Sequence, residues 1–246
     1  LVLSTVSADN GNWQLVQAKT AVYGCSSGSN ACIVYRTSGN ATLIAVPWGF
    51  SPTNLASANA GSGGSSDQGT YEFGVTWYNS YLDMEGPLDY STMLSISVST
   101  NQQVTFLPPS PIVSHATHWN IYVRRRESMT LPYRDATLQL PVTTTTYTAS
   151  FTAAGLNNYI IQAPENAKAN YAVPSGANAL CWHLSRMFVT DGKYLYYSDI
   201  DKPGQFNTAN YEPINTWDGQ KITHLISVNE ANLLILKEKS MYVLSG

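Results

Sequence analysis

Hydrophobic and polar residues alternate along much of this chain with the period of two that is typical of β-strands. The clearest run is residues 70–78, TYEFGVTWY, in which every second side chain from Tyr71 to Trp77 is large and mainly apolar. Because successive side chains of a strand point to opposite faces, one face of this strand is expected to lie in a core. No segment shows a sustained apolar period of 3.6, so the pattern predicts an all-β fold.

Shorter runs of the same kind occur before and after this segment. Strands are expected within residues 13–24 and 31–47, where the turn residues 37–40 join two β-rich runs into a hairpin. Farther along, apolar runs predict strands at residues 93–98, 104–107, 119–124, 136–140 and 144–151. Turn signals at this density predict a β-sandwich of about 80 residues.

The last third of the chain has closely spaced hairpins. RMFVTDGKYLYYSDI, residues 186–200, places Asp191-Gly192 between two strands, and this pair favours a tight primed turn. Residues 220–246 then give three short strands with turns at 229–231 and 237–240. Successive antiparallel strands of this kind are typical of a propeller blade, although a sandwich meander gives the same pattern.

The composition changes abruptly at residues 54–69, NLASANAGSGGSSDQG, which lack large apolar side chains after Leu55. Such a segment gains little from burial, so a flexible linker is expected. The predicted division is therefore 1–53 as weakly propeller-like hairpin strands, 54–69 as linker, 70–155 as a fibronectin III-like sandwich, and 156–246 as propeller-like strands that are incomplete.

Only 12% of the residues are charged, against roughly 25% in typical soluble proteins, and the net charge is −3. This balance supplies no global attraction to nucleic acid, so no specific nucleic-acid recognition is expected. No apolar run approaches the roughly 20 residues that cross a bilayer, so no membrane insertion is expected. The arginines 124–126 alternate sides on a strand, and are interpreted as surface charge available to a neighbouring subunit's acidic loop.

Residues that carry chemistry are scattered. No Gly-x-Ser-x-Gly motif is present, and neither acidic group follows the spacing of a calcium loop. The candidates are His115, His118, His183 and His224, and the acidic groups Asp83, Glu85 and Asp89, and Asp199 and Asp201. We therefore expect no enzyme, and no catalytic, cofactor-binding or metal-binding residues.

The cysteines leave one pairing open. Cys25 and Cys32 bracket a small polar loop and form either a disulfide across a hairpin or two free thiols. Cys181 lies in an apolar run and is interpreted as a buried hydrophobic residue.

Several segments carry a resemblance to a known family. GTYEFGVTWYNS with EGPLDYS, HATHWNIYVRRRES, and LPYRDATLQLPVTTTTYTASF resemble the fibronectin type III-like insert of tailed-bacteriophage virion proteins. RMFVTDGKYLYYSDIDKPGQFN, WDGQKITHLI and NLLILKEKSMYVLSG are similar to the β-propeller part of the same proteins, the neck and tail-nozzle or head-stabilisation family. The resemblance covers about residues 69–246, and departs from the family at Ala149-Ser150, where a turn aspartate is expected.

The resemblance implies a sandwich inserted between propeller strands, in a virion protein of the neck or tail. It also implies a ring of copies around the DNA channel, in contact with other neck, portal or tail proteins. A propeller needs at least four blades of about four strands, so we expect the chain to be a piece of a longer protein or to receive strands from elsewhere.

Two alternatives stay open. The first is an adhesion or glycan-binding module that uses tryptophans as a stacking platform, from the set Trp48, Trp77, Trp119, Trp182 and Trp217. Trp77 and Trp119 lie in alternating strands, where core packing is the simpler role. The second is a β-rich glycosidase-like domain, which needs paired carboxylates facing one cleft.

Overall fold

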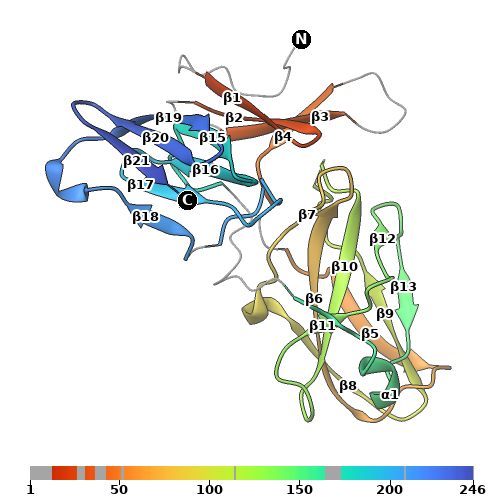
Figure 1. Ribbon diagram of the computed structural model, residues 1–246. Helices are drawn as coiled ribbons and strands as arrows, with labels where there is room; N and C mark the ends of the chain where they lie inside the picture. The colour runs from red at the N-terminus through yellow and green to blue at the C-terminus, as the bar shows by residue number, and fades with distance from the viewer. Residues whose placement is uncertain are drawn as a thin grey trace. The chain divides into compact units, whose positions relative to one another are not determined.

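The computed structural model describes residues 13–26, 31–36, 43–50, 53–113, 115–163, 173–207 and 209–245 (Figure 1). These residues confirm the all-β prediction, because helix is confined to α1 (Ala153–Leu156) and two 3-10 turns. The chain forms two compact units: unit 1 contains residues 1–50, 81–84 and 167–246, and unit 2 contains residues 51–80 and 85–166.

Unit 2 contains a large and a small antiparallel sheet. The large sheet has the order β14-β11-β10-β6-β7, with β12 on β10 and β8 on β6, and the small sheet has the order β13-β9-β5. The strands of the large sheet are β6 (Gly69–Asn79), β7 (Met84–Glu85), β8 (Leu94–Val98), β10 (His118–Arg125), β11 (Tyr133–Arg134), β12 (Leu140–Pro141) and β14 (Ile161–Gln162). Those of the small sheet are β5 (Ser57–Ser62), β9 (Gln102–Leu107) and β13 (Tyr147–Ala149).

The core of unit 2 is aromatic. The ring of Phe73 on β6 lies 4.9 Å from that of Phe106 on β9 and 5.2 Å from that of Phe151. Trp77 and Trp119 are buried on the same face of the large sheet, as directly opposed residues of β6 and β10. The alternation predicted for residues 70–78 is thereby confirmed.

The opposite face of the large sheet is also buried, around one carboxylate. Oε1 of Glu85 accepts hydrogen bonds from Thr76 Oγ1, from Asn120 Nδ2 at 2.7 Å and from Tyr122 OH at 2.7 Å. Burial, followed by the neighbouring Glu85 carboxylate, raises the pKa of Tyr122. Glu85 of β7 is thus bound to the sheet by polar contacts on the face that the alternation did not predict to be covered.

The prediction of a flexible linker at residues 54–69 is wrong. Residues 57–62 form β5, which pairs with β9 from Ser57 to Ser62, because a β-ladder is held by backbone groups and needs no large side chain. The buried hydroxyl of Ser66 accepts a hydrogen bond from Phe151 N at 2.9 Å. A Cβ at Gly64 would lie 2.2 Å from Gln102 O, so glycine permits a close backbone approach there.

Two other boundaries differ from the expectation. Residues 136–139 are not a strand, because Asp135 Oδ1 accepts from both Thr137 N and Thr137 Oγ1 and closes a side-chain turn. Only Leu140–Pro141 is extended there. Unit 2 continues beyond the expected residue 155, because Ile161–Gln162 forms β14 and pairs with β11.

Unit 1 contains three antiparallel sheets, each a simple meander, which we call the first, second and third sheets. They are the red, cyan and dark-blue sheets of Figure 1. The first sheet is β1 (Trp13–Ala18), β2 (Ala21–Ser26), β3 (Ala31–Arg36) and β4 (Leu43–Pro47). The second is β15 (Ala179–His183), β16 (Arg186–Thr190), β17 (Tyr194–Tyr197) and β18 (Tyr211–Pro213). The third is β19 (Ile222–Asn229), β20 (Asn232–Lys237) and β21 (Met241–Ser245).

The second sheet packs against the third sheet through one face and meets the first sheet along its strand β15. One face forms a buried cluster with the third sheet, from Cys181, Phe188, Leu195, Ile222, Leu225, Leu233 and Ile235. β15 also lies against β1 and β2 of the first sheet, where Leu180 N donates to Gln14 Oε1 at 3.3 Å. Three meander sheets therefore lie in series, which is how the blades of a propeller pack.

Most of the turns predicted in unit 1 are confirmed. The turns at 229–231 and 237–240 separate β19, β20 and β21, and Asp191-Gly192 separates β16 from β17. The primed form expected for Asp191-Gly192 is wrong, because only Gly192 has a positive φ (92°) and residues 191–193 connect the two strands. Residues 37–40 lie outside the described residues, but β3 and β4 pair as the predicted hairpin requires. Cys25 is buried opposite Ala31, whereas the side chain of Cys32 lies outside the described residues, so the choice between a disulfide and two free thiols stays open.

Candidate functional site

The structure does not bring together the histidines that were considered as catalytic or metal-binding candidates. His183 Nδ1 lies 2.9 Å from Ser227 Oγ, His118 Nδ1 lies 2.9 Å from Thr117 Oγ1, and burial lowers the pKa of both imidazoles. His115 is buried in unit 2, and His224 is exposed on β19. Within the described part of the chain, no three His, Cys, Asp or Glu side chains are grouped to hold a metal ion.

The acidic candidates act in local structure. Asp89 Oδ1 accepts from Ser91 N and Ser91 Oγ, and so caps the 3-10 turn η1 (Tyr90–Thr92). Asp199 Oδ1 accepts from Asn210 Nδ2 at 3.2 Å, and Asp201 lies 4.0 Å from Lys19 Nζ. Asp83 occupies a left-handed position with a φ of 47°. Turn formation accounts for these acidic residues without a shared cation.

The arginines at 124–126 are mostly engaged within unit 2, so their interpretation as freely available surface charge is wrong for two of them. Arg124 donates to Glu72 Oε2 through both Nε and Nη2, and to Thr130 O. Arg125 donates to Gln68 O at 2.6 Å and lies over the ring of Tyr71, 5.9 Å from its centroid. Arg126 remains exposed.

The tryptophans do not form a stacking platform. Trp48, Trp77 and Trp119 are buried, and Trp182 is half-buried. Trp217 differs, because 95% of its surface is exposed. Sequence alternation indicated the burial of Trp77 and Trp119, but no pattern marked Trp217 as the exposed tryptophan.

Trp217 lies on a fixed turn. The 3-10 turn η2 (Thr216–Asp218) stands between two left-handed residues, Asn215 and Gly219. Lys237, whose side chain is 1% exposed, donates through Nζ to Asp218 Oδ1 at 2.7 Å, Ile214 O at 2.9 Å and Asn215 O at 3.0 Å. The hydrogen bonds from Lys237 and from Gln220 N lower the pKa of Asp218. A buried ammonium group thus holds both ends of the turn.

The face of the third sheet that points away from the second sheet is apolar, and we call it the outer face. Strand register places Ile226, Leu234 and Val243 in one row, and His224, Leu236 and Met241 in the next. Ile226, Val243 and Met241 are 44%, 57% and 62% exposed. No side chain in these two rows is acidic, and none is a lysine or an arginine.

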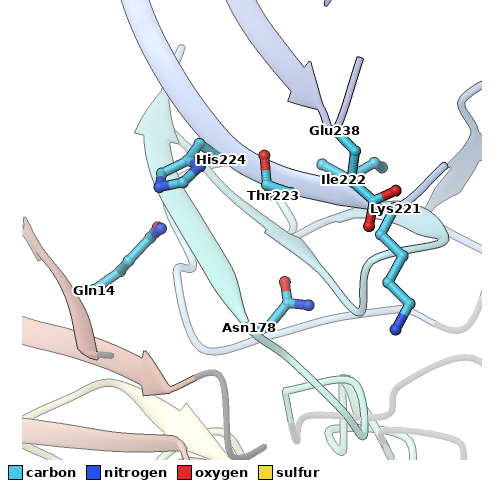
Figure 2. A pocket seen from close by; sticks show the side chains of 7 residues that line it. All are labelled: Gln14, Asn178, Lys221, Ile222, Thr223, His224 and Glu238. Carbon is cyan, nitrogen blue, oxygen red and sulfur yellow. The ribbon is translucent and has the colours of Figure 1, made fainter. Parts of the chain in front are cut away.

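A cavity of about 240 Å³ adjoins this face (Figure 2). Its lining residues are Gln14, Asn178, Lys221, Ile222, Thr223, His224 and Glu238. His224 belongs to both the cavity and the outer face, so the two are continuous. The lining contains a single carboxylate, that of Glu238, and therefore does not offer the pair that glycoside hydrolysis requires.

In unit 2, the described residues enclose a much smaller space of about 10 Å³, between apolar residues of the sandwich core such as Val123 and Phe151. This is about the space of one water molecule and is a packing gap rather than a binding site. Among the described helices, none is long and apolar enough to cross a membrane.

No known family model matches this chain, and a search of curated proteins finds no match either. The surface features that remain for function are the outer face, the adjoining cavity and the exposed Trp217, all in unit 1.

Proposed function

We propose that this chain is a structural subunit of a tailed-phage virion, in the neck or tail, assembled with further copies of itself around the DNA channel. The family resemblance of residues 69–246 suggests this location. The resemblance also implies a sandwich inserted within a propeller-like domain, and unit 2 does interrupt the sequence of unit 1.

The outer face of the third sheet is the observation that carries the assembly role. Contiguous apolar surface of this kind marks protein interaction sites. The second sheet packs on the third through one face and meets the first sheet along its strand β15, whereas within the described residues the third sheet packs on the second through one face only. A neighbouring copy continues this series of sheets by packing the aliphatic side chains of one of its own sheets against the outer face.

A charge-insertion experiment tests this role. Replacing both Ile226 and Val243 with lysine places two charges in one row of the outer face, where a contact with another sheet would desolvate them. The matched control is Ile160→Lys in unit 2, because Ile160 is 69% exposed. Sedimentation velocity of the wild-type chain should show concentration-dependent oligomers that the double variant loses and the control keeps. Equal association in all three proteins would contradict the proposal.

A further inference from the structure

Trp217 is the most exposed of the large hydrophobic side chains in the described part of the chain. An indole that is 95% exposed contributes no core packing. Large aromatic side chains of this kind are the usual anchors of protein interfaces, where a few residues carry most of the binding energy. The exposure of Trp217 therefore suggests a partner surface that receives it.

The turn that bears Trp217 is already ordered in the single chain. Lys237 binds two backbone carbonyls and the Asp218 carboxylate, and Asn215 Nδ2 donates to Tyr242 OH at 2.7 Å. Fixing the backbone of a turn before binding lowers the entropy that association would otherwise cost. Lys237 thus acts as a positioning residue for Trp217.

A convex indole on a turn suits a pocket in another protein better than a small ligand, because small ligands bind in concave sites. The chain itself has a cavity of suitable scale. At about 240 Å³ it is below the roughly 300 Å³ of typical small-molecule pockets, yet it has room for one aromatic side chain.

The lining of the cavity matches an indole chemically. Lys221 lines the cavity and offers an ammonium group for a cation–π contact. Asn178 Oδ1 has no hydrogen-bond partner among the described residues and can accept from the indole N–H when its carboxamide turns toward the cavity. Figure 2 shows the Asn178 and Thr223 side chains on one side of this space, with Gln14 and His224 opposite.

We propose that Trp217 of one copy enters this cavity of the next copy. The contact rests on the proposed function, and it places the neighbour against the outer face through the shared residue His224. The Trp217 side chain, which we call the knob, and the cavity can be joined reciprocally in a twofold dimer or head to tail. The ring of the proposed function requires the head-to-tail form, which gives a ring when the rotation closes and a filament when it does not.

Two complementary variants of the whole chain test this contact. Trp217→Ala keeps the cavity but removes the knob, and His224→Trp keeps the knob but fills the cavity. Each alone should bind its own kind at least about 30-fold more weakly than the wild type, the loss expected for an interface anchor. Mixed together, they should form a one-to-one heterodimer that grows no further, because one intact contact remains. Ile200→Ala, at a site that is 59% exposed, is the control and should assemble as the wild type does.

Folding is checked by circular dichroism, and Lys221→Trp replaces His224→Trp if the latter fails to fold. The Lys237→Met chain keeps Trp217 but should associate more weakly. The fluorescence anisotropy of Trp217, taken as the difference between chains with and without the Trp217→Phe substitution, should fall, which a structural role distant from Trp217 would not cause. Wild-type assembly by the Trp217→Ala chain would overturn the contact and leave the proposed function standing. If the wild-type chain bound glycans and Trp217→Ala lost that binding, the indole would serve as a sugar-binding group, and the proposed contact between copies would be overturned. A wild-type chain that never self-associates would refute the proposed assembly itself.

Discussion

Replacing Glu85 with alanine is the sharpest test of how unit 2 is held together. Its Oε1 accepts hydrogen bonds from Thr76, Asn120 and Tyr122, and all three donor residues are 0% exposed. The substitution leaves three buried donors without their acceptor. At about 1–3 kcal/mol for each unpaired buried group, and allowing for partial relaxation, the cost is about 3–6 kcal/mol. This is a large part of the stability of a typical domain.

Hydrogen exchange measured by mass spectrometry reports this loss locally. Backbone amides of β6 and β10 should exchange at least about 100-fold faster in the Glu85→Ala chain, which corresponds to about 3 kcal/mol. Glu85→Gln is the matched control, because it keeps an oxygen acceptor at the same place and should cost only about 1–2 kcal/mol. If the alanine variant exchanged within about fivefold of the wild type, the carboxylate would not be the fastening point of this face.

Three further predictions concern single contacts. Gly64→Ala should destabilise unit 2 by about 1–3 kcal/mol in urea denaturation, because its Cβ would meet Gln102 O at 2.2 Å. Gly61→Ala, whose Cβ would have nothing within 4 Å, should be close to neutral. Equal effects of the two substitutions would refute the close approach at Gly64. Arg124→Ala should lower the free energy of unfolding by about 2 kcal/mol, because it removes the half-buried ion pair with Glu72. Arg126→Ala, at an exposed residue, should lower it by less than about 0.5 kcal/mol. The reverse order would show that the exposed arginine contributes more to stability. The folded state lowers the pKa of Asp218, so the carboxylate should stabilise the Trp217 turn fully above its unfolded pKa of about 4. This stabilisation should be lost as the pH falls through the lower folded pKa. Tryptophan anisotropy should follow the loss, and Asp218→Asn should abolish the pH dependence.

Local alternation predicted much of the fold, because it depends on neighbours along the strand. The buried rows of β6 and β10, the Asp191-Gly192 hairpin and the meander of the third sheet all follow from such patterns. The segment 57–62 did not, since its small residues show no apolar period, and its order comes from pairing with β9 some forty residues later.

The surface features depend on partners that are distant in sequence. Arg124 meets Glu72 across two strands, and no local rule identifies that partner. Lys237 lies in a run, LKEKS, that has the character of an ordinary solvated turn, yet its ammonium group is buried under the Trp217 loop. The outer face was likewise hidden, because an alternating strand does not reveal which of its faces another sheet covers.

The most direct test of the proposed function is to locate and count this protein on purified phage particles that carry its sequence. Electron cryo-microscopy of those particles should show a ring of several copies at the head-to-tail joint, with the Trp217 turn of one copy against the Lys221 side of the cavity of the next. A protein that is absent from the particles, or present as single copies at the fibre tips, would contradict the account.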